Sequence, residues 1–96
     1  MRLHFLAAAL AVAAGFVLRV SAVEWCLIVL CIGMVLCAEA LNSAIEHLCD
    51  RVTQQQEDAI RRIKDAAAAG VLFASLAAAI VGALIFLPRL WAMIRS

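Results

Sequence analysis

The chain has 96 residues, and 68% of them are hydrophobic, a content too high for a soluble domain of this length. The formal net charge of +1 gives no indication of a nucleic-acid-binding surface. These figures favour a single domain, residues 1–96, of an all-α membrane protein.

The first apolar stretch, residues 3–20, is long enough to cross a hydrocarbon core of roughly 30 Å as a helix. Small residues at every fourth position predict close packing against another helix: Ala7, Ala11 and Gly15. A secretory signal is the competing interpretation, because Arg2 precedes an apolar run that ends in small residues around Ala22. Arg19, just before that cleavage site, counts against a signal, and we interpret the stretch as a transmembrane span.

The second apolar stretch, residues 25–46, contains two carboxylates and an amide. Glu39, Asn42 and Glu46 are spaced i, i+3, i+7 and therefore project from one face of a helix. Asp50 extends the same face. A carboxylate in hydrocarbon costs about 2.5–3.5 kcal/mol on insertion scales, so such residues usually mark a functional site. The pattern therefore predicts a functional site on this face of the helix.

Residues 47–65 form the only long polar segment and are expected to be a loop. Three spans would place this loop and the amino terminus on one side of the membrane. That side holds five basic residues: Arg2, Arg51, Arg61, Arg62 and Lys64. The other side holds three: Arg19, Arg89 and Arg95. The excess favours a cytoplasmic 47–65 loop and hence a site at the cytoplasmic face.

The third apolar stretch, residues 66–87, repeats small residues every four positions: Ala66, Gly70, Ala74, Ala78 and Gly82. Such faces let transmembrane helices approach closely. Three helices alone bury little surface, so we expect the chain to associate into an oligomer.

One long motif carries a family resemblance. The chain contains Glu39-x-x-Asn42-Ser43-Ala44-Ile45-Glu46, followed by Asp50-Arg51 and then by Lys64-Asp65. This pattern resembles the bacterial integral-membrane diacylglycerol kinase family, which includes the undecaprenol kinases, and the similarity extends over nearly the whole chain. The resemblance implies three transmembrane helices per chain, a homotrimer with shared active sites, and a multi-pass location in the bacterial inner membrane.

The resemblance also implies residue roles. In the family, the carboxylate at the position of Glu39 is the proposed general base and the one at Glu46 helps to hold Mg²⁺. Glu46, Lys64 and Asp65 would face ATP, with Lys64 acting on phosphate. The amide of Asn42, with Ser43 beside it, could orient the lipid hydroxyl or a phosphate oxygen. The alternatives are hydrogen bonding between helices for Asn42 and Ser43, and a snorkelling side chain for Lys64.

The function implied is phosphorylation of a membrane lipid hydroxyl by ATP with Mg²⁺. Diacylglycerol would give phosphatidic acid and undecaprenol would give undecaprenyl phosphate, and the sequence does not distinguish the two. The alternative is a non-catalytic or proton-coupled small membrane protein that uses Glu39, including a degenerate kinase. Family members normally begin with an amphipathic surface helix that adds a glutamate to the metal site. No residue of this chain matches that helix, and we expect an upstream start and incomplete activity without it.

Overall fold

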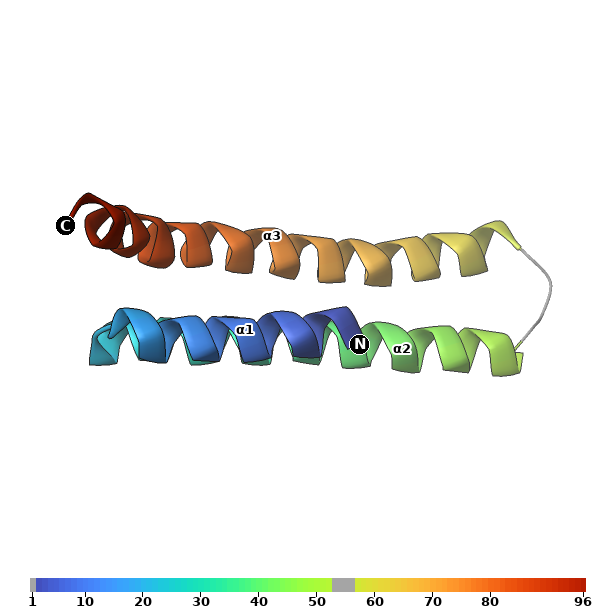
Figure 1. Ribbon diagram of the computed structural model, residues 1–96. Coiled ribbons are helices and arrows are strands. Elements are labelled where there is room, and N and C mark those ends of the chain that lie inside the picture. Colours follow the sequence, from blue (N-terminus) through green and yellow to red (C-terminus); the bar gives the residue numbers. More distant parts are fainter. Residues whose placement is uncertain (1, 53–56) are drawn as a thin grey trace.

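The computed structural model describes residues 2–52 and 57–96, and its three elements are all helices. Helix α1 covers Arg2–Leu18, α2 covers Ala22–Val52 and α3 covers Asp58–Arg95 (Figure 1). Met1 and the part of the expected loop at 53–56 lie outside the described residues. The prediction of an all-α fold with three helices is confirmed.

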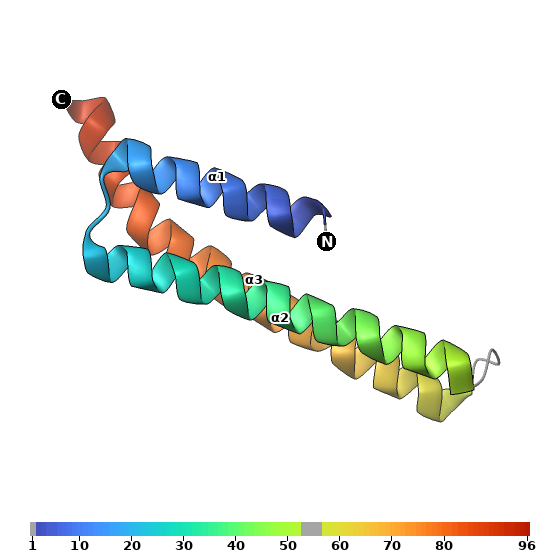
Figure 2. The ribbon, with the colours of Figure 1, turned by 90° about the horizontal axis from the view of Figure 1, so that it is seen from below.

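The helices form an elongated bundle of 58 × 20 × 17 Å. Helices α2 and α3 run antiparallel along most of their length, and α1 packs on both of them over the half of the bundle that holds the carboxyl terminus (Figures 1 and 2). The amino-terminal end of α1 lies part-way along α2. Beyond that level α2 and α3 continue as a two-helix hairpin that α1 does not cover (Figure 2).

Two of the three helices, α2 and α3, are long and apolar enough to cross a membrane. Helix α1 has 17 residues and is also apolar. At 1.5 Å per residue it is about 26 Å long, slightly less than the usual core thickness. Most large apolar side chains of the described residues are exposed, as expected of helices whose outer faces meet lipid.

The helices run past the expected spans. The polar 47–65 segment is not a loop throughout, because α2 includes residues 47–52 and α3 includes residues 58–65. Glu, Ala, Arg and Lys are good helix formers, and this segment contains no Gly or Pro to stop a helix. Helix α3 also continues through Pro88 to Arg95. Helices α2 and α3 are therefore longer than the predicted spans, which end at residues 46 and 87.

The turn between α1 and α2 is closed by two local motifs. Arg19 adopts a left-handed conformation with φ 55, and the Val20 amide donates to the Gly15 carbonyl over 3.2 Å, as in a Schellman C-cap. The Ser21 amide then donates to the Glu24 carboxylate over 2.8 Å, and the Glu24 amide donates to the Ser21 hydroxyl over 3.2 Å. This reciprocal pair is a capping box that begins α2.

Close packing at Gly15 fixes α1 against α2. A Cβ atom placed on Gly15 would lie 2.6 Å from the Trp25 ring. That ring is already held by Phe16, with ring centroids 4.9 Å apart. The absence of a side chain at Gly15 is therefore what allows α1 to approach the start of α2.

We expect Gly15→Ala to destabilise the protein by about 1–3 kcal/mol, because the added methyl must displace a packed indole. Gly33→Ala is the matched control, since a Cβ there meets nothing within 4 Å. Removing a flexible glycine from a helix should stabilise the control by about 0.5–1 kcal/mol. Unfolding in mixed detergent–SDS micelles measures both. Equal stability of the two variants would contradict this packing.

An ion pair ties the far end of α3 to the same turn. The Arg89 guanidinium pairs with the Glu24 carboxylate, with Nε donating to Oε2 over 3.3 Å, and Nη1 donates to the Arg19 carbonyl over 3.3 Å. The hydrogen bond from Arg89, helped by the Ser21 amide, lowers the pKa of Glu24 from 4.5 to about 2. One arginine thus connects α3 to the C-cap of α1 and to the capping box of α2.

The pH dependence of stability tests this ion pair. Because the folded-state pKa of Glu24 is depressed, its contribution is present above pH 4.5 and is lost as the pH falls from 4.5 towards about 2. We expect Arg89→Met to reduce stability above pH 4.5 and to flatten this acid-induced loss. Arg95→Met, which removes an exposed cation from the end of α3, should keep the wild-type profile. Thermal unfolding followed by circular dichroism between pH 2 and 7 gives the comparison, and identical profiles for all three proteins would refute it.

Candidate active site

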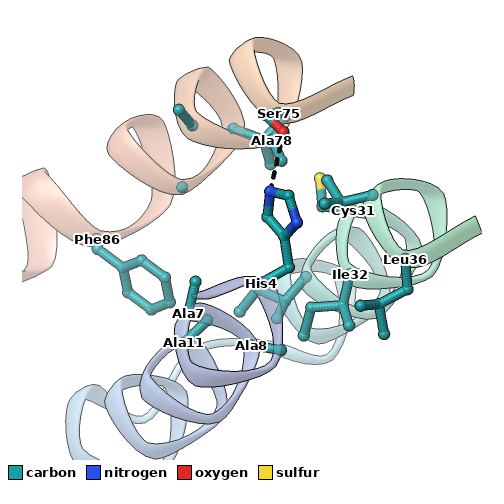
Figure 3. A pocket seen from close by; sticks show the side chains of 15 residues that line it. His4, Ala7, Ala8, Ala11, Cys31, Ile32, Leu36, Ser75, Ala78 and Phe86 are labelled. Atoms are coloured by element: carbon teal, nitrogen blue, oxygen red, sulfur yellow. Dashed lines mark hydrogen bonds between the residues drawn. The ribbon is translucent and has the colours of Figure 1, made fainter. Parts of the chain in front are cut away.

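Glu39 lies in α2 at the level where α1 begins, and its carboxylate is engaged by another helix. His4 from the first turn of α1 pairs through Nδ1 with Glu39 Oε2. The Nε2 atom of His4 lies 3.4 Å from the Ser75 hydroxyl of α3 (Figure 3). The side chains of Glu39 and His4 are only 14% and 28% exposed. Each helix therefore contributes one polar side chain to a part-buried set, the Glu39–His4–Ser75 cluster.

A cavity of about 310 Å³ lies between the three helices beside this cluster. Apart from the polar groups of His4 and Ser75, its walls are almost entirely apolar (Figure 3). The apolar wall includes Ala7, Ala11, Ile32, Leu36, Ala78 and Phe86. A hydrocarbon chain fits walls of this kind, and a polar group at its end would meet the imidazole side of the cluster.

One turn further along α2, Asn42 and Ser43 are half-buried. The Oδ1 atom of Asn42 is buried and has no hydrogen-bond partner among the described residues. A buried acceptor without a partner costs free energy, so a hydroxyl or other donor from a ligand would be favoured there. This is the physical support for the predicted orienting role of Asn42.

A second polar group lies further along the α2–α3 hairpin. Lys64 Nζ donates to Asp50 Oδ1 over 2.9 Å. This hydrogen bond raises the pKa of Lys64, and the nearby Glu46 carboxylate adds a weaker attraction. The three residues are called the Lys64 cluster. It contains two predicted site residues, Glu46 and Lys64. The third member, Asp50, is the residue that the sequence placed on the same helix face as Glu46.

The two clusters lie apart along α2. Glu39 and Glu46 are seven residues, or roughly 10 Å, apart on one face of the helix. Asp65 is exposed and makes no hydrogen bond or ion pair with any other described residue. The arrangement places a part-buried carboxylate behind the His4 ring that lines an apolar cavity, and it places a lysine ammonium with carboxylates further along the α2–α3 hairpin.

The carboxylates do not form a metal cage. Among residues 2–52 and 57–96, no three His, Cys, Asp or Glu side chains gather closely enough to hold a metal ion. Mg²⁺ is usually bound by one or two carboxylates with substrate phosphates and water. The exposed carboxylate of Glu46 beside Lys64 fits that donor set, in which ATP itself would supply most of the oxygens.

Comparison with known proteins identifies the chain. The sequence model of the family described as "Prokaryotic diacylglycerol kinase" matches residues 1–86. The chain belongs to this family. It is 40% identical over 87 residues to an undecaprenol kinase of Bacillus subtilis, covering 91% of this chain and 71% of that protein. It is 33% identical over 90 residues to a diacylglycerol kinase of Synechocystis, covering 93% of this chain and 51% of that protein, about half its length.

Membership of the family favours a lipid kinase over the non-catalytic and proton-coupled alternatives, and the predicted resemblance is confirmed. Both similar proteins are named as lipid kinases, and the apolar helices agree with a place in the membrane.

Two members of the Glu39 cluster were not predicted as site residues. These are His4 of α1 and Ser75 of α3. A polar residue in an otherwise apolar helix was the available signal in each case. Sequence spacing shows which residues share one helix face, but not which residues of another helix meet them.

Proposed function

We propose that this lipid kinase transfers the terminal phosphoryl group of ATP to the hydroxyl of a membrane lipid, with Glu39 as general base. The observation that carries the proposal is the position of the Glu39 carboxylate. It is part-buried and is held by His4, whose ring lines an apolar cavity between the three helices. A lipid alcohol whose chain occupies apolar surroundings would present its hydroxyl at such a carboxylate.

The residues divide the work between the two ends of the site. Glu39 accepts the hydroxyl proton as the lipid oxygen attacks the terminal phosphorus. Asn42 and Ser43 orient the hydroxyl or a phosphate oxygen, which gives the buried Asn42 amide oxygen a partner. Lys64 neutralises charge on the phosphates, and Asp65 faces the nucleotide beside it. The bond between the terminal phosphorus and its bridging oxygen breaks, and ADP leaves.

Mg²⁺ would be held by Glu46 together with the phosphates of ATP. When bound, it would neutralise charge on the transferring phosphoryl group. Glu46 supplies the carboxylate, and Lys64 next to it balances the remaining negative charge. A metal site completed by the nucleotide would make ATP and Mg²⁺ bind together.

The arrangement in the membrane is proposed from the sequence and the helix lengths. All three helices cross the bacterial inner membrane, with the amino terminus and the 47–65 segment on the cytoplasmic side, where ATP is found. The excess of basic residues on that side supports this orientation. Two of the small residues of α3, Ala66 and Gly70, are exposed and would let a second copy approach closely, and we propose a homotrimer.

The acceptor is undecaprenol or a diacylglycerol. The more similar of the two relatives described above is named undecaprenol kinase, and the other is named diacylglycerol kinase. The nearly apolar cavity wall suits an isoprenoid chain, which has no ester groups to satisfy. We therefore favour the polyprenol.

The test is transfer of labelled phosphate from ATP to lipid in mixed micelles, with undecaprenol and diacylglycerol supplied separately and Mg²⁺ present or chelated. We expect a labelled lipid product only with Mg²⁺, and more of it from undecaprenol. Faster turnover of diacylglycerol would reverse the choice of acceptor. A folded protein that labels neither lipid, or that labels them equally without divalent metal, would overturn the proposed function.

A further inference from the structure

We infer that His4, held by Ser75, is a positioning residue that fixes the Glu39 carboxylate for catalysis. This inference rests on the proposed function, because it concerns the base that takes the lipid proton. The imidazole contacts Glu39 of α2 through Nδ1 and lies 3.4 Å from the Ser75 hydroxyl of α3 through Nε2. A side chain of α1 therefore bridges the other two helices at the level of the base.

The contacts select one tautomer of the neutral imidazole. Such a ring has one N–H donor and one acceptor nitrogen. A carboxylate can only accept a hydrogen bond, so in the neutral ring the contact with Glu39 assigns the proton to Nδ1 of His4. The Nε2 atom is then an acceptor, and the Ser75 hydroxyl is the group that can donate to it. Ser75 thereby favours the tautomer that Glu39 needs.

Fixing the carboxylate matters because glutamate is flexible. A general base must lie within hydrogen-bond reach of the proton that it removes, and a displacement of about 1 Å can cost about 10²-fold in rate. His4 is itself restrained by the Ser75 hydroxyl, which lies 3.4 Å from its Nε2 atom (Figure 3). Its hydrogen bond restricts the rotamers of Glu39 and keeps the carboxylate beside the imidazole that lines the cavity.

The order carboxylate–imidazole–hydroxyl is also that of a nucleophilic triad, but the surroundings of Ser75 do not suit that chemistry. Ser75 lies in the interior of α3, which runs without a break from Asp58 to Arg95. The backbone N–H groups around it are used within the helix, so they cannot stabilise an oxyanion. The hydroxyl is therefore assigned to holding His4.

Kinetics of four variants test the inference in the mixed-micelle assay. His4→Ala should lower kcat by about 10²-fold with an unchanged KM for ATP, because the nucleotide contacts lie at the Lys64 cluster. His4→Asn places an amide donor near the position of Nδ1 and should recover about tenfold of that loss. Ser75→Ala should cause a smaller loss of kcat, of about 3- to 10-fold. His47→Asn, which removes an exposed imidazole from α2, is the matched control and should match wild type.

Nitrogen-15 NMR of histidine-labelled protein in micelles gives a second measurement that needs no turnover. We expect His4 to show a protonated Nδ1 and an acceptor Nε2, and Glu39→Gln to change the Nδ1 shift more than the Nε2 shift. A proton on Nε2, or no response to Glu39→Gln, would overturn the inference. So would wild-type kcat in His4→Ala, or equal losses in His4→Ala and His4→Asn with a raised KM for ATP. If wild type phosphorylates no lipid, the proposed function fails, while the NMR result still decides whether His4 holds Glu39.

Discussion

Glu39→Gln should lower kcat for lipid phosphorylation by about 10²–10⁴-fold, with little change in the KM for ATP. The amide is close in shape to the carboxylate but cannot accept the hydroxyl proton, so the loss is that of a general base. Glutamine can still accept a hydrogen bond from His4 through its side-chain oxygen, which preserves the contact between α1 and α2. The measurement is initial rate against ATP and lipid concentration, separately varied.

Glu57→Gln is the matched control, since Glu57 is exposed and its side chain makes no capping hydrogen bond at the start of α3. It should have wild-type kcat. Folding of both variants is checked by their thermal transitions. Retention of more than about a tenth of wild-type kcat by Glu39→Gln would mean that the hydroxyl proton goes elsewhere, and the assignment of the base would be withdrawn.

The fold was largely predictable because long apolar stretches in the sequence of a membrane protein usually correspond to helices. The stretches 25–46 and 66–87 lie within α2 and α3, and the stretch 3–20 overlaps α1. The helix ends were not predictable in the same way. Apolar length indicates what can lie in lipid, whereas a helix can continue into a polar segment where no Gly or Pro stops it, as at 47–52 and 58–65.

The capping box at Ser21 and Glu24 shows what a closer local analysis adds. Its S-x-x-E pattern is visible in the sequence and marks the start of α2. The pairing of Glu24 with Arg89 was not predictable, because it joins residues 65 apart in sequence through a tertiary contact. Positively charged Arg89 had been counted only for its side of the membrane.

The candidate site likewise contains residues that the sequence could place and residues that it could not. Glu39, Asn42 and Glu46 could be placed on one face because helical periodicity relates residues of one helix. The approach of His4 and Ser75 to Glu39 depends on how α1 and α3 pack against α2, which no spacing within one helix determines. Lys64 and Asp65 were taken from the family motif, and the structure adds that Lys64 pairs with Asp50.

Lys64→Met should lower kcat/KM for ATP by more than about 10²-fold. It removes the cation that pairs with Asp50 and is attracted by Glu46, and these carboxylates would then repel the phosphates of ATP. Lys64→Arg should recover only part of the loss, because a planar guanidinium does not place its charge where the compact ammonium does.

The hydrogen bond to Asp50 raises the pKa of Lys64, so its positive charge persists to a pH above the ordinary pKa of 10.5. Its contribution to activity and stability is therefore present at neutral pH and is lost only as the pH rises through that raised value.

Arg62→Gln removes a cation two residues earlier in α3, at an exposed position, and is the matched control. It should leave the KM for ATP within about twofold of wild type, which would separate local phosphate binding from the general positive charge around the 47–65 segment. Asp50→Asn completes the comparison, because it removes the negative charge of the Lys64 partner without removing the ammonium. If Asp50 only holds Lys64 away from ATP, this variant should lower the KM; if Asp50 positions the ammonium, it should raise the KM and lower kcat. Similar losses in Lys64→Met and Arg62→Gln would show that charge alone matters, and Lys64 would have no specific role at the phosphates.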